Sequence, residues 1–506
     1  MKTTTHKNQR KLIYLLLVSV LMLFACGPDT VTRVRITPTP DPAVAAVATQ
    51  TAMSMPTASY TPTLTPSPSN TPTLTATATQ TSPPTATNAP DEPTPTTPPT
   101  ESGPGPTRIG PIIGQDYVRP TLPPPPTATD GPIFGGGDDT DATQDAPIIV
   151  NPIGTDTIGI QVYSQTTFED FQRAIGDVER IGVKWVKIQA NWAFLQPDGP
   201  NQLDRLELFE RQVQLASRPE DTRVLLSIAK APLWTRSVRE EDGPPDNPQQ
   251  LADFISLLLS TKIGENIDAI EVWNEPNLLR EWRGTLPFNG DGYMQLFRPS
   301  YDVIRAASPN MPIVTAGLAP TSTLGNFAVD DRTFLQQMYS AGLTNYISDS
   351  NVVIGAHPYG WWHAPDARCC GDPNSAPGWD EDPHFYFIEN LEAVRNIMVN
   401  NGHQNGQVWV TEFGWATWEG LPGPAPDGWL ELLTARQQGE YNIRAFEIGQ
   451  ELPWVGPMFL WNLNFANETT VEQRNEIVGF SLIVPTFDVR ERPGYWAVGR
   501  ATGAIE

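Results

Sequence analysis

The sequence is poor in cysteine, in positive charge and in long apolar segments. Three cysteines in 506 residues cannot supply the disulfide framework of a small secreted scaffold. Lys and Arg number 33 against 57 Asp and Glu, giving a net charge of −24. Because nucleic-acid recognition depends on Lys and Arg, this balance argues against a nucleic-acid partner. The apolar run Leu12–Phe24 is shorter than the roughly 20 residues of a membrane span.

Proline is abundant but unevenly distributed. Residues 27–150 contain 26 of the 52 prolines, and the rest of that stretch is mostly Thr, Ala and Ser. Such a composition cannot bury enough apolar surface to offset the entropy of ordering the chain. We therefore expect a disordered Pro/Thr-rich linker at 26–150 and one folded domain at 151–506, which carries 25 Lys and Arg against 46 Asp and Glu. The linker favours extended polyproline II geometry and would act as a spacer.

The first 26 residues have the pattern of an export signal. Lys2, Lys7, Arg10 and Lys11 precede the apolar run, which suits the core of a signal peptide. The run ends at Leu23-Phe24-Ala25-Cys26, which resembles a bacterial lipobox. This resemblance implies a signal peptide at 1–25, lipidation of Cys26 and an extracellular protein tethered to the cell membrane. An uncleaved anchor helix with an incidental cysteine is the alternative, and it also places the protein outside the cytoplasm.

Short apolar runs alternate with longer amphipathic ones throughout the folded part. The expected strands are Ile158–Val162, Trp185–Gln189, Val224–Ile228, Ala269–Trp273, Ile313–Gly317, Val352–Ala356, Val408–Thr411 and Pro457–Trp461. Helical patterns are expected at Phe168–Ile181, Leu251–Ile263, Tyr293–Ala307, Arg332–Ala341, Phe385–Asn400 and Ala435–Ile448. Eight such units in about 350 residues predict an α/β fold, the (β/α)8 TIM barrel. A doubly wound sheet is the runner-up, but no Gly-x-Gly-x-x-Gly motif follows the first strand.

Two glutamates end predicted strands. Strand four runs into Asn274-Glu275-Pro276, and strand seven into Thr411-Glu412-Phe413-Gly414-Trp415. Active-site groups of such barrels gather at the carboxyl ends of the strands, so both carboxylates should face one cavity. Paired carboxylates can divide the acid and nucleophile roles of glycoside hydrolysis. The alternative to a catalytic role is a structural one, in which a glutamate caps a helix or pairs with a lysine. For a single glutamate the structural role is the commoner case, but it is less common for two glutamates placed in this way.

The two motifs together resemble glycoside hydrolase clan A, and the chain is most similar to family 39 or family 5 members. The resemblance implies a retaining glycosidase with Glu275 as acid/base, Glu412 as nucleophile and Asn274 at the 2-hydroxyl of the substrate. It also implies that His357 and Tyr359, after strand six, contact the sugar or orient the nucleophile. By the same resemblance, Trp461 at strand eight forms a platform for a sugar ring. No cofactor and no metal are implied.

Further side chains are expected around the cleft. Asn191 shares one face of strand two with Lys187 and Gln189 and could line the floor of the cleft. Trp234 follows strand three and Trp415 follows strand seven. Tryptophans in predicted loops stack well on the C–H faces of pyranose rings, so the group favours a polysaccharide or oligosaccharide substrate. Its members are Trp192, Trp234, Trp282, Trp361, Trp362, Trp379, Trp415, Trp418 and Trp429.

The remaining cysteines, Cys369 and Cys370, are adjacent in the segment after strand six. Neighbouring Cα atoms about 3.8 Å apart fall below the usual disulfide window of roughly 4.4–6.8 Å, so a bridge and two free thiols both stay open. His363, Asp366, Asp372 and Asp380 lie nearby but match no established pattern of metal ligands.

The principal hypothesis is an extracellular retaining glycoside hydrolase that acts on a β-linked polysaccharide or oligosaccharide by double displacement. The alternative is an inactive barrel that binds glycans at the cell surface. That alternative does not require both glutamates with Asn274 beside one of them.

Overall fold

Eight parallel strands close into a barrel in the order β1 to β8, with β1 paired to both β2 and β8. The computed structural model describes residues 147–219, 221–370, 381–485 and 490–506. The strands are β1 Ile158–Val162, β2 Trp185–Asn191, β3 Arg223–Ala229, β4 Ala269–Val272, β5 Ile313–Thr315, β6 Val352–Ala356, β7 Val408–Phe413 and β8 Val455–Leu460. The predicted TIM barrel and its eight strands are confirmed, with ends shifted by a few residues.

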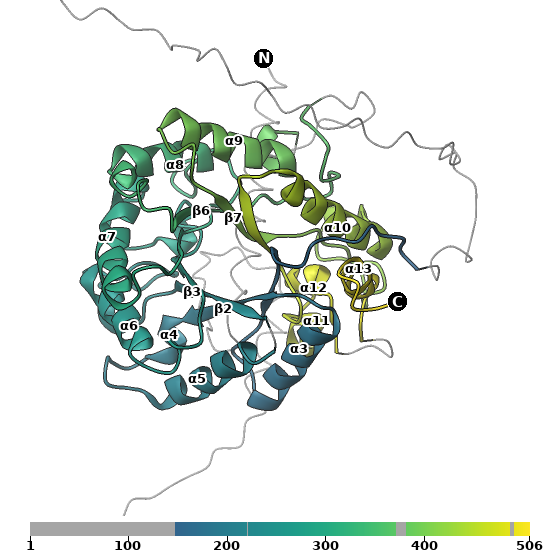
Figure 1. The fold of residues 1–506 in the computed structure, drawn as a ribbon, viewed down its shortest axis with the longest axis horizontal. Coiled ribbons are helices and arrows are strands. Elements are labelled where there is room, and N and C mark those ends of the chain that lie inside the picture. The colour runs from purple at the N-terminus through teal and green to yellow at the C-terminus, as the bar shows by residue number, and fades with distance from the viewer. Residues whose placement is uncertain (1–146, 220, 371–380, 486–489) are drawn as a thin grey trace, which may run out of the picture. The chain divides into compact units, whose positions relative to one another are not determined.

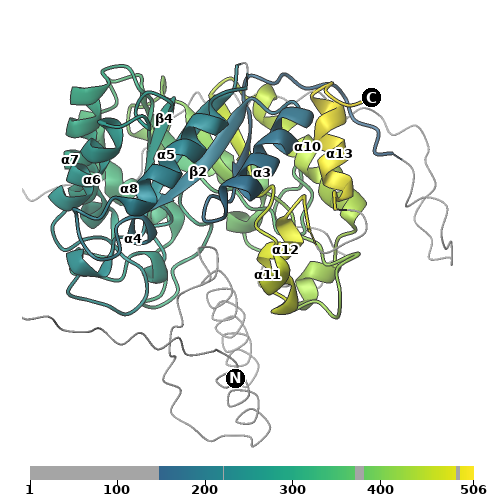
Figure 2. The same ribbon diagram turned by 90° about the horizontal axis from the view of Figure 1, so that it is seen from below.

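Helices surround the barrel (Figures 1 and 2). The long ones are α3 Phe168–Arg180, α5 Asp204–Ala216, α6 Gln249–Leu259, α7 Gly290–Ala307, α8 Asp331–Ser340, α9 Phe387–Asn400, α10 Ala435–Glu451 and α13 Pro493–Ala501. Short α-helices are α4 Trp192–Leu195, α11 Glu468–Glu472 and α12 Ile477–Phe480. The 3-10 turns are η3 Leu233–Thr235, η4 Leu279–Glu281, η5 Leu343–Asn345, η6 Pro383–Phe385 and η7 Gly428–Glu431.

The six predicted helical segments correspond to α3, α6, α7, α8, α9 and α10, whereas the sequence analysis missed α5 and α13. In α5 the buried residues Leu206, Phe209, Val213 and Ala216 are spaced three or four apart. This spacing gives a helix one apolar face. The signal was therefore present in the sequence.

The interior of the barrel has an apolar lower layer and a polar layer above it. The lower layer consists of one inward side chain from each of β2 to β8, namely Trp185, Leu225, Ala269, Val314, Val353, Trp409 and Phe459. The next inward positions of β2 and β4, two residues further along each strand, are Lys187 and Glu271, both fully buried. The apolar layer closes the lower end, so the polar groups face the carboxyl ends of the strands.

The segments predicted at the N-terminus lie outside the described residues. These are the signal peptide 1–25, the lipidation site Cys26 and nearly all of the linker 26–150. Of the residues that are described, none belong to a helix both long and apolar enough to traverse a bilayer. The predicted tether therefore stays a prediction.

Candidate active site

Glu275 reaches the mouth of the barrel because the backbone turns sharply after β4. Trp273 and Glu275 have φ values of 76° and 42°, a left-handed conformation that non-glycine residues rarely adopt. The Glu275 backbone N–H donates to Gly317 O at 3.0 Å, which fixes the turn against the end of β5. Strained backbone of this kind concentrates at functional sites. The Glu275 side chain is buried, with 5% of its surface exposed.

Glu412 lies at the end of β7, and both of its carboxylate oxygens are held by donors. Lys187 Nζ lies 3.0 Å from Oε1, and Tyr359 OH donates to Oε2 at 3.1 Å. Lys187 comes from β2 and Tyr359 from the segment after β6. Donors from β2 and from the segment after β6 therefore fix the orientation of this carboxylate.

His357 connects the two glutamates. Its Nδ1 lies 3.2 Å from Glu275 Oε1 and 3.9 Å from Glu412 Oε2, and its Nε2 lies 3.1 Å from Thr411 Oγ1. A ring nitrogen of His357 and one oxygen of each glutamate all lie within 4.8 Å of one another. Gly317 makes room for the ring, because a Cβ at that position would come 2.2 Å from His357 Nε2. The structure thus brings Glu275, Glu412, His357 and Tyr359 together.

Positive charge surrounds this pair of carboxylates. Arg280 Nη2 donates to Glu275 Oε2 at 3.0 Å, and both side chains are more than nine-tenths buried. Burial alone would raise the pKa of Glu275, but the hydrogen bond from His357 and the charges of Arg280 and His357 outweigh it and lower the pKa to about 2. For His357, burial opposes the cation, yet the charge of Glu412 and the contact with Glu275 raise its pKa above 6.5. In the free protein these shifts favour an ionised Glu275 beside a protonated His357.

Sequence analysis did not identify Arg280 as a site residue. It lies five positions after Glu275, in the 3-10 turn η4, and its carboxylate contact depends on how that turn folds back. The only signal in the sequence was a cation close to the Asn274-Glu275-Pro276 motif.

Asn274 is a nearly buried amide with no partner among the described residues. Its side-chain oxygen is removed from solvent and accepts no hydrogen bond, and 9% of the residue is exposed. A buried amide without a partner carries a desolvation penalty of about 1–3 kcal/mol. Next to Glu275, such a group suits a ligand hydroxyl.

The other predicted contact residues differ in how they are placed. Trp461 follows β8 and packs edge-on against Tyr359, with ring centroids 6.2 Å apart. Asn191 ends β2, but its oxygen accepts from Phe194 N at 3.0 Å and so caps α4. Trp234 is half-buried and donates to Gln196 O at 2.7 Å. Trp461 therefore packs against a hydrogen-bond partner of Glu412, whereas Asn191 and Trp234 have structural partners of their own.

Trp415 corrects the expectation of a sugar contact. It is fully buried, donates from Nε1 to His363 O at 2.8 Å, and packs against Phe387 of α9 and Tyr441 of α10. Most other loop tryptophans are buried as well: Trp192, Trp282, Trp361, Trp418 and Trp429. Trp234 and Trp362 are half-buried, and Trp379 lies outside the described residues. The group is mostly core packing behind the mouth of the barrel, so it does not form an extended aromatic cleft.

Within the described part of the chain, two clusters have the donor atoms that a metal ion could use, Glu275–His357–Glu412 and Asp330–Asp331–His384. In the first, Arg280 and Lys187 each lie 3.0 Å from a carboxylate and already supply positive charge. In the second, His384 Nε2 lies 2.8 Å from Asp330 Oδ2, and Nδ1 lies 2.5 Å from Asp382 Oδ1. Burial opposes the imidazolium of His384, but Asp330 and Asp382 raise its pKa to about 9. Both clusters are thus balanced by cations of the chain itself.

Cys369 and Cys370 are joined as a disulfide in the structure, which is one of the two arrangements that the sequence left open.

No known family model matches this chain, and neither does any curated protein sequence. Solved structures do share its fold. One is a family 39 glycoside hydrolase from the gut symbiont Bacteroides cellulosilyticus WH2, with 16% identity, a TM-score of 0.48, and coverage of 69% of this chain and 64% of that one. Thermotoga maritima Cel5A, in complex with mannotriose, has 13% identity, a TM-score of 0.42 and coverage of 68% and 97%. ZgEngAGH5_4, in complex with a cellotriose, has 17% identity, a TM-score of 0.42 and coverage of 69% and 96%.

These neighbours include glycoside hydrolases of families 39 and 5. At identities of 13 to 17% the likeness concerns the barrel, and this chain spans less than two thirds of the family 39 structure. The function proposed below rests on the geometry of the site.

Proposed function

We propose that this protein is a retaining glycoside hydrolase that cleaves a β-linked polysaccharide or oligosaccharide. One observation carries the proposal: Glu275 and Glu412, from opposite sides of the barrel, place carboxylate oxygens within 4.8 Å of one another. Retaining glycosidases hold their two carboxyl groups roughly 5–5.5 Å apart, whereas inverting ones leave about 6.5–9.5 Å for a water molecule. The N-terminal signal and Cys26 support an extracellular, lipid-tethered location as part of the same proposal.

The contacts of the two glutamates support a different role for each. Lys187 and Tyr359 hold Glu412 in one orientation, as attack on an anomeric carbon requires. Glu412 forms a bond to that carbon while the bond to the leaving oxygen breaks and Glu275 protonates that oxygen. In the second step Glu275 takes a proton from water, and the resulting hydroxide replaces Glu412 at the same carbon.

His357 supplies the proton that an ionised Glu275 lacks. Its Nδ1 is within hydrogen-bond distance of Glu275 Oε1, so the proton can pass through Glu275 to the leaving oxygen. In the second step the proton from water returns by the same route. Because the two groups interact strongly, they act as a pair that shares one proton.

This shared proton predicts a pH dependence. The pKa of His357 is raised above 6.5, so its proton persists near neutral pH and is lost on the alkaline side. We expect kcat/KM for an alkyl glycoside to fall as the pH rises through the raised pKa of His357. A dinitrophenyl glycoside, whose leaving group needs no proton, should show a much weaker decline in its first step. Pre-steady-state measurement of the two substrates from about pH 5 to pH 10, a range that covers the titration of a histidine, tests this expectation. An unchanged decline in a His357→Asn variant would contradict it.

Asn274 predicts how the site recognises the sugar. If its unpartnered amide binds the 2-hydroxyl, Asn274→Ala should lower kcat/KM for ordinary glycosides by about 10–100-fold, the equivalent of a buried hydrogen bond of about 1–3 kcal/mol. The same substitution should have little effect on 2-deoxyglycosides, because they lack that hydroxyl. Measuring kcat/KM of the wild type and of Asn274→Ala, each on an ordinary glycoside and on its 2-deoxy analogue, forms a double-mutant-type cycle between the side chain and the hydroxyl. Equal losses on the two substrates would show that Asn274 has another role.

The proposal itself is tested by the stereochemistry of the product. A panel of β-linked oligosaccharides is incubated with the full chain, and the anomer released first is identified by NMR. We expect the β-anomer, since two inversions restore the original configuration. Release of the α-anomer would indicate inversion, and binding without turnover would favour the glycan-binding alternative.

A further inference from the structure

Arg280 lies between two buried carboxylates, and only one of them belongs to the glutamate pair. Its Nη2 donates to Glu275 Oε2 at 3.0 Å, and its Nε lies 3.8 Å from Oε1 of Glu281. All three side chains are more than nine-tenths buried. The double displacement proposed for Glu275 and Glu412 does not use Glu281. The burial of Glu281 beside the acid/base therefore needs an explanation of its own.

The backbone of Glu281 is fixed to the end of β4. Its N–H donates to Leu278 O at 3.0 Å, and its carbonyl oxygen accepts from Trp273 Nε1 at 3.1 Å. Trp273 directly follows β4 and lies two residues before Glu275. The turn that carries Arg280 and Glu281 is thus attached to the strand end that carries Glu275, which keeps the three charged groups together.

Four charged side chains act on the Glu281 carboxyl. Burial is the largest influence, and it raises the pKa of this group. The cations Lys230 and Arg280 lower the pKa, whereas the anions Asp242 and Glu275 add to the effect of burial. Lys230 Nζ lies 2.5 Å from Asp242 Oδ2, so these two charges oppose each other. The resulting pKa of Glu281 is about 7, which means that this carboxyl gains and loses its proton near neutral pH.

The charge of Glu281 changes the electrostatic field at Glu275. While Glu281 is neutral, the charge of Arg280 stabilises the ionised form of Glu275, and this opposes proton transfer from His357. Once Glu281 is ionised, its negative charge offsets part of the effect of Arg280. Glu275 then takes up the proton more readily, as general acid catalysis requires.

We propose that Glu281 is a positioning residue that competes with Glu275 for the guanidinium of Arg280, and that it thereby controls how readily Glu275 takes up the proton for the leaving oxygen. The proposal rests on the proposed function, because it concerns the acid step of glycoside cleavage. The electrostatic link between the two carboxyls does not depend on turnover, so it can be measured separately.

The kinetic test compares the full chain with its Glu281→Gln variant on an alkyl glycoside. Gln resembles the neutral carboxyl, so both proteins should have similar kcat/KM at about pH 5.5, below the pKa of Glu281. The ratio of wild-type to variant kcat/KM should rise to about tenfold by about pH 8.5, the effect of one pKa unit on Glu275. His357 titrates in both proteins and cancels from the ratio. With a dinitrophenyl glycoside, which needs no proton, the ratio for the first step should not change with pH.

Infrared titration measures the link without a substrate. The C=O stretch of protonated carboxyls is followed against pH, and subtraction of the Glu281→Gln titration removes other buried acids such as Glu476. The remaining carboxyl should titrate at about pH 7. In a Glu275→Gln background, with the matching double variant subtracted, the midpoint should be lower because a negative charge has been removed.

Two results would overturn the proposal. One is an infrared midpoint of Glu281 that does not move in the Glu275→Gln background. The other is a ratio of kcat/KM on the alkyl glycoside that stays constant across the pH range. If the midpoint moves but the wild-type chain cleaves nothing, the link between the two carboxyls stands and the hydrolase proposal fails.

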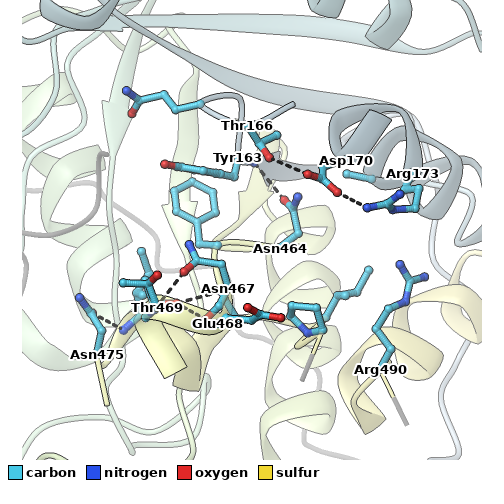
Figure 3. Close-up of a pocket in the computed structure, with 18 of the residues that line it drawn as sticks. Tyr163, Thr166, Asp170, Arg173, Asn464, Asn467, Glu468, Thr469, Asn475 and Arg490 are labelled. Atoms are coloured by element: carbon cyan, nitrogen blue, oxygen red, sulfur yellow. Dashed lines mark hydrogen bonds and ion pairs between the residues drawn. The ribbon is translucent and has the colours of Figure 1, made fainter. Parts of the chain in front are cut away.

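Asp177→Asn is the matched control. The Asp177 side chain is 9% exposed, as that of Glu281 is, and Arg490 Nη2 lies 2.7 Å from its Oδ1. This pair lines a separate cavity between α3 and α11, where Figure 3 shows Arg490. Of the described residues that line this cavity, none has a proposed catalytic role. The ratio of wild-type to Asp177→Asn kcat/KM should therefore stay constant with pH, and a rise equal to that of Glu281→Gln would overturn the specific role of Glu281.

Discussion

Replacing Glu412 with Gln is expected to abolish turnover of every glycoside, whatever its leaving group. The change keeps the size of the side chain and removes the oxygen charge that attacks the anomeric carbon. Without the nucleophile no covalent intermediate can form, so we expect a loss on the order of 10⁴-fold or more in kcat. Steady-state kinetics with an alkyl glycoside and a dinitrophenyl glycoside measure this loss in kcat. A loss confined to the alkyl glycoside would contradict the role assigned to Glu412.

Glu275→Gln should behave differently, because an activated leaving group departs without a proton. We expect alkyl glycosides to lose about 10²–10⁴-fold, the contribution of general acid catalysis, while a dinitrophenyl glycoside still reacts in its first step. The glycosyl–Glu412 intermediate should then accumulate and be detectable by mass spectrometry of the intact protein. Added azide, which needs no general base, should release it as a β-glycosyl azide.

Glu476→Gln provides a matched control for both variants. Glu476 is buried as well, and burial raises its pKa to about 8, so this carboxyl is neutral near pH 7 and Gln resembles it closely. We expect this variant to retain wild-type kinetics. Comparable losses in all three variants would indicate damage to the fold rather than loss of chemistry.

The sequence was sufficient to predict the strands and the two glutamates because both are local signals. Each strand is a mostly apolar run of three to seven residues. In a (β/α)8 barrel the residues that follow the strands all lie at the same end of the barrel. Glu275 and Glu412 follow β4 and end β7, so their proximity required only the strand count. The structure adds the 4.8 Å limit on their separation and the bridging position of His357.

Side-chain direction could not be read in the same way. Trp415 and Trp418 lie two and five residues beyond β7, and nothing local distinguishes a tryptophan that faces a cleft from one that faces a helix. Trp415 faces helices α9 and α10, because Phe387 of α9 and Tyr441 of α10 pack against its ring. Arg280 was missed for a related reason, since its contact with Glu275 depends on a tight turn. Contacts between residues far apart in the sequence, or between turns of the folded chain, determine both the direction of Trp415 and the position of Arg280. No short motif contains that information.

Lys187 is the cation between two buried carboxylates, Glu271 and Glu412. Its Nζ lies 3.0 Å from Glu271 Oε2 and 3.0 Å from Glu412 Oε1, and neither Lys187 nor Glu271 is exposed to solvent. Burial would lower the pKa of Lys187, but the charges of the two glutamates outweigh it and raise the pKa. Burial likewise would raise the pKa of Glu271, and the charge of Lys187 reverses the direction. Lys187 and Glu271 therefore stabilise each other's charged forms.

Replacing Lys187 with Met should accordingly destabilise the fold by about 3–5 kcal/mol, the cost of leaving a buried charge without its partner. The lowered pKa of Glu271 means that its ionised form stabilises the wild type above its ordinary pKa of 4.5, and that this contribution is lost as pH falls. In the variant the sign reverses, so the defect should be largest near neutral pH and shrink as Glu271 takes up a proton. Denaturant unfolding at about pH 5 and about pH 7.5 measures the free energy of unfolding of both proteins, since burial without a cation raises the pKa of a glutamate well above 4.5. Adding Glu271→Gln to Lys187→Met should restore part of the lost free energy of unfolding, since it removes one buried carboxylate that no longer has a cation beside it.

The exposed pair Lys262 and Glu265 supplies the comparison, with 54% and 63% of the side chains accessible. Lys262→Met should leave the unfolding midpoint unchanged, because water already solvates both charges. If Lys187→Met is no more harmful than this control, the buried cation does not hold the nucleophile in place. In that case the fixed orientation of Glu412, on which the double displacement depends, would need a different source.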